Sequence, residues 1–203
     1  WVFRYSYRNY TLNQQYSTKE QTQNHRPTNR DRNTSVRKYN QLAVLVNANY
    51  DFGQTSMAAV IQPYHIIEKG RYRIGIFGLG VDLNGLVPER NFEGIAMKDP
   101  FESAAAVIKE LKDTKCNLII CLSHLGYQYE DKSKPSDVLL AEQVSGIDLI
   151  LGGHTHTFMQ APTKVTQQDG QTVYIHQVGW AGVRLGAIEV TEHKMNFLQK
   201  IIH

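Results

Sequence analysis

Residues 147–157 read IDLILGGHTHT and join a short apolar run to two glycines and two histidines. The apolar run has the length and branched composition of a buried strand. Gly152 and Gly153 mark the point where the chain leaves the sheet and where its backbone passes close to another group. His154 and His156 follow at the carboxyl end of that strand, where open α/β sheets place their ligand sites. Neutral histidine is a frequent metal ligand, so the stretch favours a metal site over two solvated loop histidines.

A second stretch repeats the same arrangement earlier in the chain. Residues 117–126 read NLIICLSHLG, an apolar strand followed by a small polar residue, a histidine and a glycine. Two parallel strands that each carry histidine at the same end bring those side chains to one edge of a sheet. We therefore expect His124, His154 and His156 to form one cluster.

Alternating strands and helices precede and connect these two stretches. Asp99 suits a helix N-cap, Pro100 the first helical position and Glu102 the third position of a capping box, so a helix begins there. A second helix is expected over residues 135–144. The expected strands are residues 42–46, 60–67, 71–80, 117–122 and 147–151. This β–α–β–α–β order predicts parallel strands, right-handed crossovers and an α/β fold.

Two β-hairpins are expected on either side of this core. The predicted pairs are residues 60–67 with 71–80 and residues 172–179 with 183–191. Lys69-Gly70 would form the first turn, and Trp180-Ala181-Gly182 would form the second. A last strand is expected over residues 196–202.

Residues 1–40 differ from the rest of the chain in charge and composition. They hold eight lysines and arginines and two acidic residues, whereas the remainder holds 14 basic and 17 acidic residues. Val2, Leu12 and Val36 are their only aliphatic residues, and no helical or strand period is present, which predicts a disordered basic tail. Basic residues interleaved with tyrosine also fit a nucleic-acid-binding arm, but their scattered placement argues against nucleic acid as a partner.

The composition of the whole chain indicates a globular protein without a membrane span. Its mean hydropathy is −0.40, and 41% of its 203 residues are hydrophobic. No apolar run approaches the roughly 20 residues that a spanning helix needs.

The stretch AEQVSGIDLILGGHTHT, together with SHLG, resembles the calcineurin-like metallophosphoesterases, above all their 5′-nucleotidase branch. The resemblance runs from about Leu42 to the C-terminus and implies the C-terminal part of a metallophosphoesterase α/β sandwich, with metal ligands at the carboxyl ends of strands. It makes residues 41–203 a partial domain. Further segments that match are VNANYDF at 46–52, RIGIFGLG at 73–80, KDPFESA at 98–104 and QVGWAGVRLG at 177–186.

The resemblance also implies a two-metal site with divalent zinc, manganese or iron. It assigns His124 and His154 to one ion and His156 to the other. The family's remaining ligands and its catalytic histidine belong to upstream motifs, of which only Asn24 and His25 give a trace. Residues 1–40 are therefore either a basic tail or a disturbed remnant of the domain's first half, and the sequence assigns no catalytic or substrate-binding residue.

The resemblance implies a hydrolase of phosphate monoesters, with nucleoside 5′-monophosphates as the best match. The partner would be a small phosphate ester or nucleotide, and the family is often exported to the periplasm or cell surface. We expect weak activity from this chain, because a site without its bridging carboxylate holds the second metal poorly. Two alternatives remain open: a catalytically inactive metal-binding fragment and a nucleic-acid-binding module that uses the basic tail. The sequence leaves the metal, the exact substrate and the oligomeric state undetermined.

Overall fold

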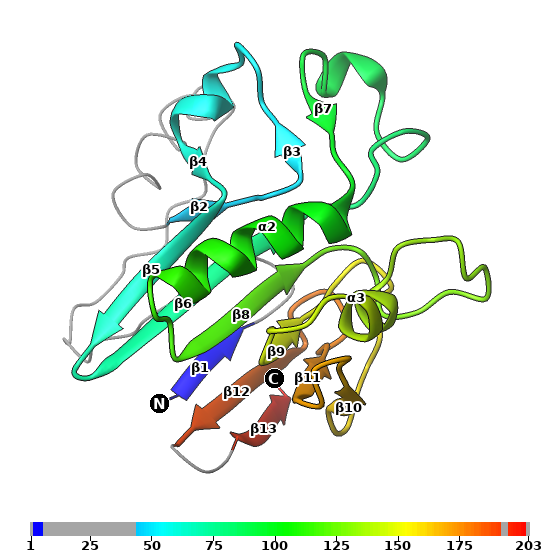
Figure 1. Cartoon of the computed structure of the whole chain (residues 1–203). Coiled ribbons are helices and arrows are strands. Elements are labelled where there is room, and N and C mark those ends of the chain that lie inside the picture. The colour runs from blue at the N-terminus through cyan, green and yellow to red at the C-terminus, as the bar shows by residue number, and fades with distance from the viewer. Residues whose placement is uncertain (1, 6–43, 192–194, 202–203) are drawn as a thin grey trace, which may run out of the picture.

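The computed structural model describes residues 2–5, 44–191 and 195–201. A six-stranded sheet forms its centre, and the parallel strands lie side by side in the middle (Figure 1). Within these ranges no helix is both long and apolar enough to cross a bilayer. In spatial order the strands are β10 (Thr163–Thr166), β11 (Thr172–His176), β9 (Leu149–Leu151), β8 (Leu118–Ser123), β6 (Tyr72–Leu79) and β5 (Tyr64–Lys69).

The direction of the strands follows the expected pattern. β6, β8, β9 and β11 pair in parallel, whereas β5 and β10 are antiparallel edge strands. The parallel strands read as nearly continuous apolar runs because both faces of the sheet are covered. Their common direction brings the segments after β8 and β9 to the same edge.

Two helices cover one face of this sheet. Helix α2 (Pro100–Asp113) begins at the predicted N-cap, where the Asp99 carboxylate accepts from the backbone N–H groups of Phe101 and Glu102. Helix α3 (Asp137–Gln143) is capped by Ser136, whose hydroxyl accepts from Leu139 N–H at 3.3 Å. Buried residues of this layer include Ala104, Val107, Ile108, Leu111, Leu140 and Ala141, which pack with Phe77, Ile119, Cys121 and Ile150 of the strands.

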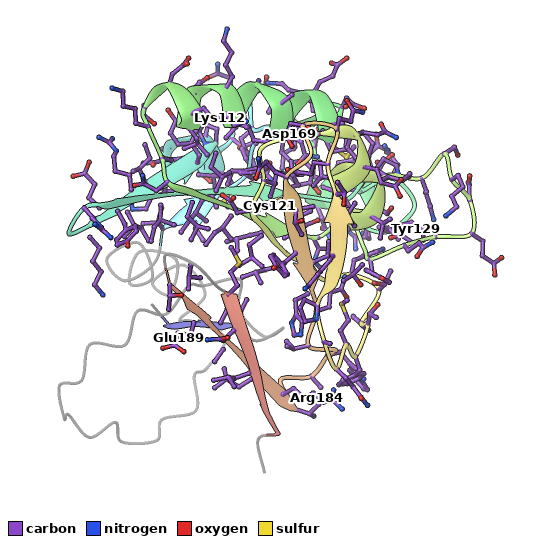
Figure 2. All side chains as sticks on the ribbon, turned by 60° about the horizontal axis from the view of Figure 1, so that its bottom comes forward. Lys112, Cys121, Tyr129, Asp169, Arg184 and Glu189 are labelled. Carbon is purple, nitrogen blue, oxygen red and sulfur yellow. The ribbon has the colours of Figure 1, made fainter. Side chains whose placement is uncertain are left out.

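A second, three-stranded sheet covers the other face. Its order is β1 (Val2–Tyr5), β12 (Arg184–Val190) and β13 (Met195–Ile201), all antiparallel. Ile188 of β12 packs against Ile120 and Leu149 of the main sheet. Figure 2 shows Lys112 of α2 on one side of the main sheet and Arg184 and Glu189 of β12 on the other. The layers form an α/β sandwich, which confirms the predicted fold class.

A small lobe lies beside the carboxyl end of β6. It contains β2 (Leu45–Val46), β4 (Ile61–Gln62), β3 (Tyr50–Asp51), β7 (Ala96–Met97) and two 3₁₀ turns (Ser56–Ala59 and Glu89–Asn91). Asn49 joins the lobe to the sheet, because its side-chain amide donates to Gly80 O at 2.9 Å and accepts from Gly80 N–H at 2.7 Å. The lobe therefore has a fixed position next to the end of β6.

The structure corrects two expectations and adds a strand. Residues 172–179 and 183–191 do not form a hairpin: β11 pairs with β9 and β10, whereas β12 belongs to the other sheet. The turn at 180–182 instead joins the two sheets, since Gly179 and Gly182 adopt left-handed conformations that redirect the chain. Residues 2–5 were expected to belong to an unstructured tail, but they form β1, because they pair with the edge of β12 in antiparallel orientation. Residues 6–40 lie outside the described part, and β10 was not predicted.

Candidate metal centre

His124 follows directly after β8, and its backbone is fixed to the neighbouring strand. Its N–H donates to Leu79 O at 2.8 Å. The preceding residue, Ser123, is fully buried, so His124 lies at the point where the chain leaves the core. The side chain is thus delivered from the carboxyl end of a central parallel strand, as predicted.

His154 and His156 lie on the loop after β9 in unusual backbone conformations. Their φ angles are +67° and +56°, in the left-handed region that a non-glycine residue occupies only at an energetic cost. The close approach expected at the preceding glycines is present at Gly152, where a Cβ atom would lie 2.1 Å from a carboxyl oxygen of Asp137. The loop is therefore shaped by its surroundings rather than by its own preference.

The rings of His124 and His154 lie together. Their centroids are 5.2 Å apart with an interplanar angle of 66°. Burial, followed by the neighbouring histidines, lowers the pKa of His124 to about 4, and burial also lowers the pKa of His154. Both imidazoles are consequently neutral at pH 7, the form that can donate a nitrogen lone pair to a metal ion.

His156 takes a different position from the other two histidines. Its ring stacks on Trp180, with centroids 6.0 Å apart and an interplanar angle of 14°. Trp180 is 54% exposed. Within the described ranges, no group of three or more His, Cys, Asp or Glu side chains is placed to hold a metal ion. The structure thus pairs two of the three predicted ligands, and the three-histidine cluster stays a prediction.

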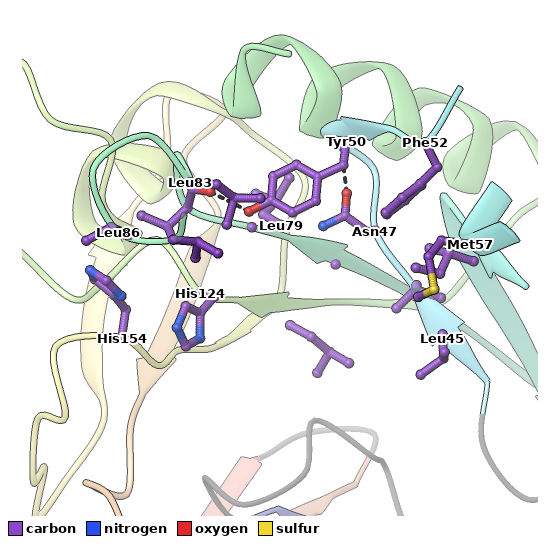
Figure 3. Close-up of a pocket in the computed structure, with 17 residues that line it drawn as sticks. Leu45, Asn47, Tyr50, Phe52, Met57, Leu79, Leu83, Leu86, His124 and His154 are labelled. Atoms are coloured by element: carbon purple, nitrogen blue, oxygen red, sulfur yellow. Dashed lines mark hydrogen bonds between the residues drawn. The ribbon is translucent and has the colours of Figure 1, made fainter. Parts of the chain in front are cut away.

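Two cavities adjoin the paired histidines. The larger, of about 690 Å³, is lined by both rings and by apolar residues of the small lobe, including Leu45, Tyr50 and Leu83 (Figure 3). The other, of about 560 Å³, is lined by His154 together with polar groups such as Lys134. The positive charge of Lys134 contributes to the lowered pKa of His154. A molecule held at the paired rings would have an apolar space on one side and a polar one on the other.

The two remaining candidates from the sequence fall outside the described residues, and two acidic side chains of the described part have structural roles. Asn24 and His25 lie in the segment that the structure does not describe. The Asp148 carboxylate accepts from Ile119 N–H at 2.7 Å, at the amino ends of β8 and β9 and away from the histidine edge. Asp51 forms an ion pair with Lys98 at 3.4 Å.

Sequence reasoning missed a polar cluster beneath the histidine loops. Ser123, Asp137 and Gln177 are each at most 1% exposed and are linked by hydrogen bonds. Asp137 lies near the start of the helix expected over residues 135–144, and Gln177 is the first residue of the matching segment QVGWAGVRLG, but neither observation indicates that the two side chains meet. The one available signal was Gly152, whose missing side chain leaves room for both.

Comparison with known proteins shows consistent relatives. No model of a known protein family matches the chain. It is 29% identical over 149 residues to the trifunctional nucleotide phosphoesterase YfkN of Bacillus subtilis, which covers 69% of this chain and 10% of that protein. It is 33% identical over 115 residues to the 5′-nucleotidase of Vibrio cholerae, which covers 52% of this chain and 21% of that enzyme.

Solved structures give the same result. The 5′-nucleotidase precursor of Thermus thermophilus superposes with a TM-score of 0.68 at 26% identity, over 81% of this chain and 35% of that one. The calcineurin-like phosphoesterase YfkN of Bacillus subtilis has the same fold, with a TM-score of 0.56 at 21% identity over 77% of this chain and 55% of that one. This chain's relatives are 5′-nucleotidases and calcineurin-like phosphoesterases. The predicted resemblance is confirmed, and these relatives are hydrolytic enzymes.

The chain corresponds to only part of its relatives. It spans about a tenth of the phosphoesterase YfkN and about a fifth of the Vibrio cholerae 5′-nucleotidase. The match therefore relates this chain to one part of these larger enzymes.

Proposed function

We propose that this chain is the histidine-bearing part of a metal-dependent phosphoesterase that hydrolyses phosphate monoesters, with nucleoside 5′-monophosphates as the best candidates. The observation that carries the proposal is the pairing of His124 and His154, 5.2 Å between ring centroids, from the ends of adjacent parallel strands. The names of the relatives, 5′-nucleotidase and nucleotide phosphoesterase, support the same substrate class.

The donor set fits a borderline divalent ion. Two imidazoles that are neutral at pH 7 and carried by rigid strands are typical ligands for zinc, manganese or iron. In this proposal His124 and His154 hold one ion, and His156 contributes to a second. Ions bound there would polarise a phosphoryl oxygen and lower the pKa of a bound water.

The residues around the pair have separate tasks in this proposal. Lys134 lines the polar cavity beside His154, where its ammonium group would attract the negatively charged phosphate. The cavity on the other side gives the same two rings a mainly apolar surrounding, and low polarity strengthens the electrostatic interactions within the site. In this proposal the chain binds and orients the phosphate ester. The proposal also includes export from the cytoplasm, which the resemblance implies.

A direct assay tests the proposal. The purified chain, loaded with Mn²⁺ or Zn²⁺, is assayed with p-nitrophenyl phosphate and with adenosine 5′-monophosphate. Weak turnover that disappears in His154→Ala supports the proposed function. Turnover that is unchanged in this variant contradicts the site.

A second candidate is a metal-binding unit without catalysis of its own. It is favoured by one observation: the described residues contain no group of three ligands. Metal binding that depends on His124 and His154, without turnover of either substrate, would establish this second candidate and exclude the first for this chain.

A further inference from the structure

The two histidine loops rest on a buried cluster of polar side chains. Ser123 and Asp137 are 0% exposed, and Gln177 is 1% exposed. They come from three separate places: the end of β8, the start of α3 and the residue after β11. Polar groups at this depth cost free energy unless they are hydrogen-bonded, so the pattern of their bonds shows what the cluster holds.

Asp137 is bonded to the loop that carries His124. One carboxyl oxygen accepts from the Ser123 hydroxyl at 2.5 Å, and the same hydroxyl accepts from Leu125 N–H at 3.1 Å. The backbone N–H of Asp137 donates to Gly126 O at 2.8 Å. These contacts hold the residues on both sides of His124.

Gln177 is bonded to the loop that carries His154 and His156. Its amide nitrogen donates to Gly153 O at 3.0 Å, and its amide oxygen accepts from Thr157 N–H at 3.1 Å and from the Thr155 hydroxyl at 3.3 Å. The three bonded residues are the immediate neighbours of the two histidines along the chain.

Hydrogen bonds also join the two sets of contacts to each other. The amide nitrogen of Gln177 also donates to the second carboxyl oxygen of Asp137, at 3.2 Å. Thr155 adds a direct bridge, since its hydroxyl accepts from Tyr127 N–H at 3.0 Å. Gly152 makes room for the pair, because a Cβ atom there would lie 2.1 Å from Asp137 and 2.7 Å from Gln177.

We propose that Asp137 and Gln177 are positioning residues that set the distance and orientation between the His124 loop and the loop of His154 and His156. The role of these loops in metal binding rests on the proposed function, whereas the positioning itself does not. Their hydrogen bonds reach the residues on either side of the histidines along the chain, and through these residues they act on the loops.

The backbone of the second loop shows why such support is needed. His154 and His156 both have positive φ. A non-glycine residue keeps this unfavourable conformation only where contacts with its surroundings stabilise it. The Gln177 bonds to Gly153 and Thr157 fix both ends of this segment. Removing them frees the two histidines to relax toward ordinary conformations.

The test needs variants that separate positioning from stability. Gln177→Leu removes both polar ends of the amide at similar volume, and Asp137→Asn places an amide group opposite the amide nitrogen of Gln177. Thr155→Val removes only the bridging hydroxyl and is expected to fold. Asp148→Asn is the matched control: it alters a half-buried, hydrogen-bonded carboxyl at the opposite edge of the same sheet.

Each variant is made in the full chain and measured in two ways at neutral pH. Amide hydrogen exchange at Thr155 and Thr157 and the imidazole NMR signals of the three histidines report loop geometry without any metal. Zinc affinity is then measured by titration calorimetry. Urea unfolding of each variant shows how much of any change follows from lower global stability.

The positioning proposal predicts local changes that the control lacks. Gln177→Leu should speed exchange at Thr157 on the order of 10-fold more than Asp148→Asn does at equal global stability. Where the wild type binds zinc, the two positioning variants should weaken it by roughly 10- to 100-fold. The double variant Asp137→Asn with Gln177→Glu should recover part of the loss, because the new carboxylate can accept from Asn at position 137 and from Thr157 N–H.

The outcomes separate the two proposals. Equal effects of Asp148→Asn and Gln177→Leu on the histidine signals and on exchange at Thr157, after correction for stability, would overturn the positioning role. Absence of zinc binding in the wild type would count against the proposed function, and the exchange and NMR measurements would still decide the positioning question.

Discussion

The two ring contacts at the histidine edge differ in how they are held. The inner pair, His124 and His154, is partly buried, attached to adjacent central strands and supported from below by buried hydrogen bonds. The outer pair, His156 and Trp180, is exposed, and its two rings are joined by stacking. The inner pair is therefore set by the core of the domain, whereas the contact between the outer rings lies at the surface, where a ligand or a partner could replace it.

The largest expected effect comes from filling the space beneath the inner pair. Gly152→Ala places a methyl group against Asp137 and Gln177 and should lower the free energy of unfolding by about 3 kcal/mol or more. Gly70→Ala is the control, since a Cβ atom there meets nothing within 4 Å and only the positive φ of +59° costs about 1 kcal/mol. Urea unfolding measures both. Equal losses would mean that the space under the loops is not tightly filled.

The next effect distinguishes the two pairs as ligands. His154→Ala should weaken binding of the first zinc or manganese ion by at least ~100-fold, because it removes half of the inner pair. His156→Ala should change the first binding event by less than about 3-fold and affect only a second, weaker one. Titration calorimetry of both variants gives the stoichiometry and the affinities. The same loss in both would show that the three histidines act as one cluster.

A third effect depends on pH and concerns the support of the inner pair. Burial raises the pKa of Asp137 to about 7. The folded protein thus binds more protons than the unfolded chain between about pH 4 and pH 7, so this group lowers stability as pH rises through that range, by at most about 1.4 kcal/mol per pH unit. Asp137→Asn abolishes this dependence.

Urea unfolding from pH 4.5 to pH 8 measures the difference between wild type and Asp137→Asn. The wild type should have its largest relative advantage at the acidic end and lose it toward pH 7. Burial lowers the pKa of His176 to about 4, which costs stability as pH falls below about 6.5, but this contribution is common to both proteins and cancels. A difference that does not vary with pH would place the pKa of Asp137 near its ordinary value.

The smallest effect is expected at the outer pair. Trp180→Ala should change the free energy of unfolding by less than about 1 kcal/mol, because the side chain is 54% exposed. It should nevertheless shift the imidazole proton signals of His156, since the stacked ring is lost, while those of His124 stay in place. Trp180→Phe should retain most of the shift. A large loss of stability would show that the outer pair is also part of the core.

Much of the fold could be predicted because local signals and packing agree. Asp99, Pro100 and Glu102 predict the start of α2, and continuous apolar runs predict β6, β8 and β9. The hairpin after residue 172 was wrong because alternation and turn residues describe strands but not their partners. β12 pairs with β1 and β13 rather than with β11, and their sheet covers one face of the main sheet. No local sequence pattern records this packing of one sheet on another.

The candidate site was predictable in part for a related reason. The motifs predict that His124 and His154 meet, since consecutive parallel strands end at the same edge. They do not predict that His156 stacks on Trp180, because that contact depends on the turn between the two sheets. Asp137 and Gln177 lie 40 residues apart, and their meeting depends on how α3 and β11 pack.

The turn at residues 180–182 gives the outer pair a further property. It connects β11, a parallel strand of the main sheet, to β12, a strand of the three-stranded sheet that covers one face of the main sheet. A shift of one layer relative to the other would act directly on Trp180, because its turn links the two sheets, whereas the ends of β8 and β9 belong to one sheet. The contact between His156 and Trp180 therefore depends on the alignment of the two sheets more directly than the contact between His124 and His154 does.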